Sequence, residues 1–155
     1  MRLATILLLN FLIFNNPSYS KDIIGFSTVI DADTIRIDKF KIRLEGIDAP
    51  ELKQVCMNNN QTYFCGKVSK IKLQEKIGKK KVSCILTSKD KYSRYLGVCY
   101  VERINLNKWL VRNGYAIAYK RYSKAYVKDE KFAKDNRLGI WSGHFIQPEK
   151  WRKKN

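Results

Sequence analysis

The order of apolar and polar residues in the first half of the chain is typical of β-strands. Residues Ile23 to Ile30 and Thr34 to Asp38 are rich in β-branched side chains. The segment Phe40 to Glu45 alternates strictly between apolar and charged residues, which is the period of a strand with one buried face. This alternation places the side chain of Arg43 on the polar face of the predicted sheet. Two further strand-like runs, Val82 to Leu86 and Gly97 to Val101, flank a polar loop.

Helix signals lie between and after these strands. Apolar residues at helical spacing, each run stopped by a glycine, predict helices over Lys67 to Ile77 and over Leu106 to Asn113. A third helix is expected to begin at a Ser123 cap and to run toward Arg137. About five strands with helices inserted between and after them predict an α+β domain built on a small β-barrel.

The length of 155 residues is that of one domain. The positive start Met1-Arg2 and the mainly apolar run that follows it predict a removable signal peptide over residues 1–20. We therefore expect the folded domain to occupy residues 21–145, followed by a basic and only partly ordered tail over residues 146–155. An uncleaved membrane anchor is the alternative for the N-terminal segment.

The net charge of +17, from 31 basic and 14 acidic residues, predicts an acidic partner. Nucleic acid is the leading candidate because its phosphates release counterions for each Lys or Arg that binds them. Anionic membranes and heparin-like polymers are the alternatives.

The four cysteines fit an exported protein because their number is even and their spacing gives no zinc motif. Cys84 and Cys99 face each other if the two strand-like runs around them fold as a hairpin. Cys56 and Cys65 bracket a polar stretch that a disulfide would close into a loop. We therefore predict the pairs Cys84–Cys99 and Cys56–Cys65.

Acidic residues are scarce in this chain, yet six of the fourteen fall between Asp31 and Glu51. Asp33 and Asp48 lie on turns where strands end, and Pro50 stiffens the second turn so that the carbonyl of Ala49 is aimed at a cation. Hard oxygen ligands favour calcium over zinc or copper, with magnesium as the competitor. The plain alternative is that Asp and Pro merely populate turns.

Five segments together resemble the staphylococcal nuclease-like, or thermonuclease, family, and they stand in the family's order: Val29–Thr34, Ile42–Glu51, Asp90–Arg94, Leu110–Gly114 and Leu138–Trp141. The resemblance implies an OB-fold: a five-stranded β-barrel with about three helices. It also implies a calcium-dependent phosphodiesterase that acts on DNA and RNA and leaves a 3′-phosphate and a free 5′-hydroxyl.

The resemblance assigns roles to individual residues. Asp33, Asp48 and the carbonyl of Ala49 match the calcium ligands. Glu51 matches the glutamate that positions the attacking water, and Arg43 and Arg94 match the two phosphate-binding arginines. The residues that match the nucleotide pocket are Lys91, Tyr92 and Tyr119.

We therefore expect an exported, monomeric, calcium-dependent nuclease, periplasmic or secreted, that prefers single strands or frayed duplex. The chief rival is an OB-fold module that binds nucleic acid without cleaving it. The retained carboxylates argue against that rival, because a pure binder has no use for negative charge beside phosphate. A polybasic surface or adhesion protein is the third hypothesis.

Overall fold

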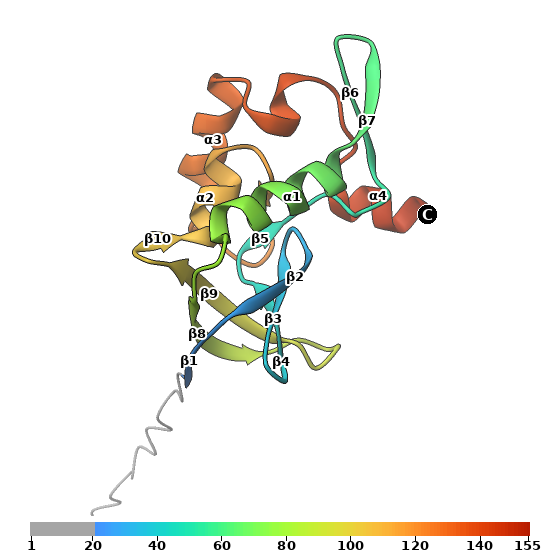
Figure 1. Cartoon of the computed structure of the whole chain (residues 1–155). Helices are drawn as coiled ribbons and strands as arrows, with labels where there is room; N and C mark the ends of the chain where they lie inside the picture. Colours follow the sequence, from blue (N-terminus) through green and yellow to red (C-terminus); the bar gives the residue numbers. More distant parts are fainter. Residues whose placement is uncertain (1–20) are drawn as a thin grey trace, which may run out of the picture.

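A computed structural model describes residues 21–155, so the predicted signal peptide lies outside the described residues. The strands are β1 (Lys21–Gly25), β2 (Ser27–Asp31), β3 (Thr34–Ile37), β4 (Phe40–Leu44), β5 (Ile47–Asp48), β6 (Val55–Asn58), β7 (Gln61–Phe64), β8 (Val82–Lys89), β9 (Tyr95–Val101), β10 (Ile104–Asn105) and β11 (Ile117–Ala118). The helices are α1 (Cys65–Ile77), α2 (Leu106–Arg112), α3 (Val127–Asp135), the 3₁₀ turn η1 (Gly139–Ser142) and α4 (Pro148–Lys154). Figure 1 shows their arrangement.

The main sheet is curled into a barrel. Its strand order is β1-β8-β9-β4-β3-β2, and β10 is added to β9. The two ends of this order, β1 and β2, are separated in sequence by Phe26 alone, so they are two halves of one bent strand. Counting that bent strand once gives five main strands, which confirms the predicted α+β barrel of the OB type. The four main antiparallel pairings are completed by one parallel pairing, between β4 and β9.

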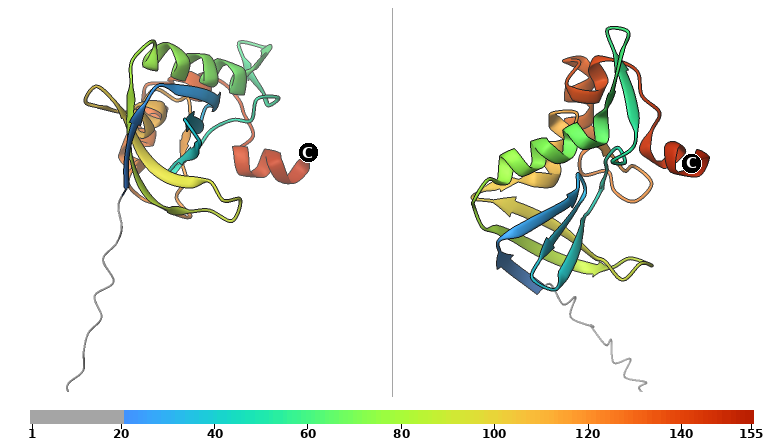
Figure 2. Two further views of the ribbon diagram at one scale, coloured as in Figure 1. Left: turned by 60° about the horizontal axis from the view of Figure 1, so that its bottom comes forward. Right: turned by 45° about the vertical axis from the view of Figure 1, so that its right-hand side comes forward.

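The core fills the space between the barrel and the helices. Ile42 and Leu44 of β4 are fully buried, as the strict alternation of that strand predicts. They belong to one apolar cluster with Leu73 of α1 and Leu110 of α2. In the two views of Figure 2, α1 crosses one side of the curled sheet. Helix α2 packs against β9, and α3 packs against α2.

All three predicted helices are present, with some boundaries shifted. Helix α1 begins at Cys65, two residues before the predicted start, and ends at Ile77, directly before Gly78, whose φ of 58° suits glycine. Helix α2 ends at Arg112, two residues before Gly114. Helix α3 begins at Val127, not at Ser123. The Ser123 hydroxyl instead accepts a hydrogen bond from the Ala125 amide at 3.2 Å, so this serine stabilises a turn before the helix.

Both predicted disulfides are present. Cys84 and Cys99 are paired in register across β8 and β9 and are fully buried. Cys56–Cys65 joins β6 to the start of α1. The polar stretch between these two cysteines forms a hairpin, in which Asn59 and Asn60 both have positive φ.

The expectation of a partly ordered tail is wrong. Residues 148–154 form the helix α4, which begins with a buried Pro148 at a position where proline suits a helix start. The residues before it are tied to the hairpin, because Met57 and His144 exchange backbone hydrogen bonds of 2.9 and 2.8 Å. This fourth helix exceeds the expected number of about three.

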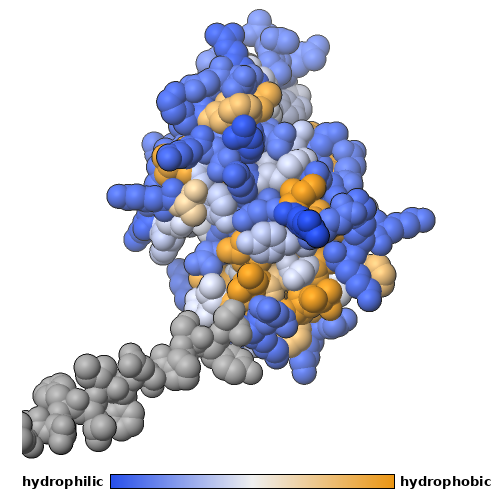
Figure 3. All heavy atoms as spheres, turned by 90° about the vertical axis from the view of Figure 1, so that its left-hand side faces the viewer, coloured by the Kyte–Doolittle hydropathy of each residue, from blue (hydrophilic) through white to orange (hydrophobic). Residues whose placement is uncertain are grey.

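Hydrophilic residues cover most of the face shown in Figure 3, with apolar patches between them. Within residues 21–155, every helix is too short or too polar to cross a membrane.

Candidate active site

Three carboxylates and one arginine meet at one end of the barrel. Asp33 lies in the turn between β2 and β3, Arg43 on β4, and Asp48 at the end of β5. Glu51 follows on the loop after β5. Figure 1 shows the β2–β3 turn and β5 below α1, on the side that faces α4. Of the six clustered acids of the sequence, Asp38 and Glu45 lie apart: Asp38 is exposed in the β3–β4 turn, and Glu45 accepts a hydrogen bond from the Thr87 hydroxyl.

Arg43 is the centre of this site. Its guanidinium binds Asp33 Oδ1 at 2.5 Å through Nη1, and Asp48 Oδ1 at 3.1 Å through Nη2. Burial lowers the pKa of Arg43, but the charges of Asp33 and Asp48 outweigh burial and hold that pKa above its ordinary value. Arg43 thus remains positively charged, and two carboxylates orient its guanidinium. Its side chain lies on the polar face of the strand, as the alternation in the sequence predicts.

Asp33 is buried and also fixes the neighbouring loop. The Ala49 amide donates to Asp33 Oδ2 at 3.1 Å, and the Thr34 hydroxyl donates to Oδ1 at 3.1 Å. Ala49 thus contacts Asp33 through its N–H, whereas the sequence assigns its carbonyl to a cation. The N–H and the carbonyl of Ala49 belong to successive peptide units, so the amide contact fixes one side of the residue that carries the carbonyl.

The loop that carries Glu51 is pressed against the start of α1. A Cβ on Gly66 would lie 1.9 Å from the carbonyl oxygen of Glu51, so only glycine permits this approach. The buried Gln54 side chain accepts a hydrogen bond from the Glu51 amide at 3.3 Å. The side chain of Glu51 is 37% exposed, which leaves it accessible to water.

Arg152 of α4 reaches the same carboxylates, a contact that no pattern in the sequence predicts. It binds both oxygens of Asp48, at 2.9 and 3.0 Å, and Glu51 Oε1 at 2.9 Å. Burial raises the pKa of Asp48, and the hydrogen bonds and charge of Arg152 oppose this rise. The same contacts outweigh burial at Arg152 and raise its own pKa.

Asp31 is a second residue without an assigned role that lies in the site. Its Oδ1 accepts a hydrogen bond from the Asp33 amide at 3.1 Å. Burial, followed by the charge of Asp33, raises the pKa of Asp31 to about 6. It lines a hollow of about 210 Å³ together with Glu51 and Trp151. The Asp-x-Asp spacing of Asp31 and Asp33 is the signal that would have included it.

The structure does not bring Arg94, Lys91 or Tyr92 into contact with these carboxylates. All three lie on the β8–β9 loop, where Arg94 pairs with Asp90 at 2.7 Å. Burial raises the pKa of Asp90, but hydrogen bonds from Arg94 outweigh this and lower it. Lys91 and Arg94 both lie over the ring of Tyr92, at 5.0 and 5.5 Å from its centroid. The loop thus presents a basic and aromatic surface separate from the carboxylates.

Tyr119 lies near Asp48. It lines a hollow of about 160 Å³ together with Asp48 and Gln147. Burial, followed by the negative charge of Asp48, raises the pKa of Tyr119. Its ring packs edge-on against Tyr122, with 4.7 Å between centroids.

The donor set of the site suits a hard cation. Asp33 and Asp48 supply carboxylate oxygens, and Asp31 and Glu51 lie beside them. Across residues 21–155, no three acidic, histidine or cysteine side chains already converge in the geometry of a bound metal. The oxygens of Asp48 are instead bound by Arg43 and Arg152.

Comparisons with known proteins show the family to which this chain belongs. The profile of a family described as "Staphylococcal nuclease homologue" matches residues 41–143. A succinoglycan biosynthesis protein, ExoI, of Rhizobium meliloti is 33% identical over 89% of this chain and 73% of its own length. An uncharacterized endonuclease of Haemophilus influenzae is 32% identical over 97% of this chain and 84% of its own. A probable staphylococcal-like nuclease, CAN2, of rice is 32% identical over 78% of this chain, but this match covers only 31% of the rice protein. The chain therefore belongs to the staphylococcal nuclease homologue family.

Proposed function

We propose that this protein is an exported, calcium-dependent nuclease that hydrolyses the phosphodiester bonds of DNA and RNA. The observation that carries the proposal is the meeting of Asp33, Arg43, Asp48 and Glu51 at one end of the barrel of a strongly basic protein. A phosphodiester is negatively charged, so it suits a site that contains Arg43 in a protein of net charge +17. A water molecule bound at Glu51 supplies the nucleophile.

Glu51 has the position of a general base. Its carboxylate is partly exposed and is held on a loop that Gly66 and Gln54 fix in place. In the proposed reaction Glu51 orients a water molecule and accepts its proton, while the water oxygen bonds to phosphorus. The bond from phosphorus to the 5′ oxygen breaks, and that oxygen takes a proton from solvent water, which leaves a 5′-hydroxyl and a 3′-phosphate. Glu51 then returns its proton to solvent.

The arginines supply positive charge for the phosphate. Arg43 is oriented by two carboxylates, so its free N–H groups require little rearrangement to bind a phosphate oxygen. Arg94 is held by Asp90 on the β8–β9 loop. In the proposed complex, a nucleic-acid strand lies along the basic and aromatic surface formed by Lys91 and Tyr92 on the same loop, which brings its phosphates to Arg94. Planar guanidinium groups bind two phosphate oxygens at once, which Lys does not.

Calcium is the cation that we propose for this site, held by Asp33, Asp48 and the Ala49 carbonyl. It would supply charge for the negative oxygens of the reacting phosphate. Flexible coordination by carboxylate and carbonyl oxygens favours calcium over magnesium, which needs a near-ideal octahedron. We expect calcium to support cleavage and magnesium alone to support it poorly.

The remaining parts of the proposal concern location and form. Two buried disulfides fit an oxidising compartment, and we propose that residues 1–20 are a signal peptide removed on export to the periplasm or the medium. We propose that the mature protein is a monomer that takes single strands or frayed duplex most readily, with Tyr92 and Tyr119 available to stack on bases.

The test is the substitution Glu51→Gln in residues 21–155. It keeps the size of the side chain and removes its charge, so the turnover rate on single-stranded DNA in calcium should fall about a hundredfold or more. DNA affinity should stay equal or rise, because a negative charge beside phosphate is lost. Glu75→Gln is the matched control: within residues 21–155, this exposed residue of α1 forms an ion pair with Lys72 alone.

A rate for Glu51→Gln equal to that of the parent and of Glu75→Gln would reject the catalytic role and favour a module that only binds nucleic acid. Cleavage in excess chelator at the rate seen with calcium would reject the calcium requirement.

A further inference from the structure

Helix α4 places a positive charge where the proposed cation has to bind. Arg152 donates Nη1 to Asp48 Oδ1 at 2.9 Å and Nη2 to Asp48 Oδ2 at 3.0 Å. This is a bidentate pair with a carboxylate whose side chain is completely buried. Nη1 also binds Glu51 Oε1 at 2.9 Å. One guanidinium therefore joins a proposed calcium ligand to the proposed general base.

The two oxygens of Asp48 differ in their partners. Oδ1 accepts from Arg43 at 3.1 Å as well as from Arg152. Among the described residues, Oδ2 accepts a hydrogen bond from Arg152 alone. A calcium ion lies about 2.3–2.6 Å from each ligand oxygen, so it would stand in the space that this guanidinium fills. Two cations at that separation repel strongly, and the buried surroundings weaken solvent screening.

The attachment of α4 allows the helix to leave. Its anchored part is the segment before it: the backbone of His144 is bonded to Met57, and the Gln54 amide donates to the Ile146 carbonyl at 2.6 Å. Beyond Gln147 only Pro148 is buried in α4. The link from the half-buried Glu149 side chain to Arg121 is 3.5 Å long. Trp151 is half-buried and lines the hollow beside Asp31 and Glu51. The helix is thus held over the site by Pro148, by Trp151 and by the ion pairs of Arg152, and the ion pairs are the contacts that a cation at Asp48 would replace.

We propose that α4 is an internal competitor for the cation: Arg152 neutralises Asp48 and Glu51 in the absence of metal, and calcium binds only when Arg152 leaves them. This inference rests on the proposed function, because it takes Asp48 as a calcium ligand. It adds that the C-terminal helix sets the calcium concentration at which the site fills. The site then stays blocked by its own arginine wherever calcium is scarce.

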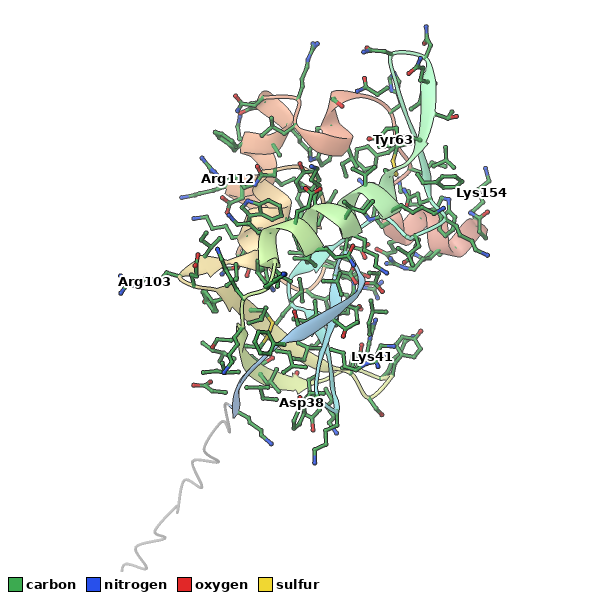
Figure 4. The ribbon with its side chains drawn as sticks, in the orientation of Figure 1. Asp38, Lys41, Tyr63, Arg103, Arg112 and Lys154 are labelled. Atoms are coloured by element: carbon green, nitrogen blue, oxygen red, sulfur yellow. A yellow bond between two sulfur atoms is a disulfide. The ribbon has the colours of Figure 1, made fainter. Side chains whose placement is uncertain are left out.

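The first measurement is calcium affinity by titration calorimetry, without nucleic acid, on residues 21–155. Arg152→Gln should bind calcium at least tenfold more tightly than the parent. Lys154→Gln is the control, because it removes the same charge from the outer end of the same helix, where Figure 4 shows Lys154. Its affinity should stay within about twofold of the parent, since a distant exposed charge is largely screened.

The second measurement is amide hydrogen exchange of residues 149–155 in the parent protein. Calcium should raise their exchange rates several-fold, because α4 loses its ion pairs with Asp48 and Glu51 when Arg152 is displaced. Unchanged or slower exchange at saturating calcium would overturn the inference, as would equal calcium affinities of the parent and Arg152→Gln.

The two proposals fail in different ways. Equal, measurable calcium binding by the parent and Arg152→Gln rejects the internal competitor and leaves the nuclease proposal intact. Absence of calcium binding in both proteins rejects the calcium site itself and, with it, the competitor.

Discussion

Arg43 and Arg152 bind the same buried carboxylate, that of Asp48, but the first lies on a central strand of the barrel and the second on a short C-terminal helix. Arg43 belongs to β4, a strand paired on both sides, and its side chain is 15% exposed. Arg152 belongs to a seven-residue helix at the end of the chain, and its side chain is 34% exposed. Both bind Asp48 at similar distances, 3.1 and 2.9 Å.

The difference shows that similar contact distances do not imply similar roles. Removing Arg43 leaves the buried carboxylates of Asp33 and Asp48 close together at the end of the barrel. Arg152 would then be the remaining arginine at this site, and it pairs with Asp48. Removing Arg152 leaves Asp48 its pair with Arg43 and opens the site to a cation. The barrel arginine is therefore part of the fold, whereas the tail arginine is replaceable by a metal ion.

The largest expected effect is that of Arg43→Ala. Breaking a buried ion pair by removing one partner costs about 3 kcal/mol or more of unfolding free energy, because the remaining charge is left uncompensated. Urea denaturation of residues 21–155 in chelator should show this loss, and DNA cleavage in calcium should fall at least a hundredfold. A variant as stable as the parent would show that the barrel end tolerates the loss of Arg43, and the comparison with Arg152 would fail.

The barrel end around Arg43 was predictable from the order of apolar and charged residues, whereas the tail around Arg152 was not. Arg43 lies within a strict apolar and charged alternation, so both its strand and the face on which it lies were predictable. The acidic turns were predictable too, because Asp33 and Asp48 end strand-like runs. The same reasoning paired the cysteines correctly, since Cys84 and Cys99 stand at matching places in two runs.

The tail carries no such signal. Residues 146–155 contain many basic side chains and too few apolar ones to define a buried face, so Arg152 looks like its neighbours Lys153 and Lys154. Its role depends on a contact with Asp48 across 104 positions of the chain, which only the folded structure reveals. The late start of α3 has a local cause: Ser123 prefers a turn bond to Ala125 over a helix cap.

A second prediction concerns Arg94, which the structure places on the β8–β9 loop and not among the carboxylates. Arg94→Lys keeps the charge and loses the planar fork, so the turnover rate on DNA in calcium should fall about a hundredfold. DNA affinity should change much less, because Lys keeps the positive charge and so releases the same number of counterions from the DNA.

Arg103→Lys is the control for Arg94→Lys: Figure 4 shows Arg103 at the far side of the molecule from α4. Single-turnover rates and filter-binding affinities separate the two effects. A large loss of affinity with an unchanged rate would make Arg94 a binding residue of the basic surface with no part in the chemical step.

The smallest expected effect is that of Arg152→Ala on stability in chelator. The side chain of Arg152 is partly exposed, and Asp48 keeps its pair with Arg43, so the loss of unfolding free energy should be about 1 kcal/mol or less. Added calcium should offset this loss and stabilise the variant more than the parent, since only the parent has to release its own arginine first. Urea denaturation with calcium and with chelator, on both Arg43→Ala and Arg152→Ala, measures the contrast directly. If Arg152→Ala costs as much as Arg43→Ala, and calcium restores neither, then α4 is a fixed part of the barrel end and its arginine is a structural ion pair.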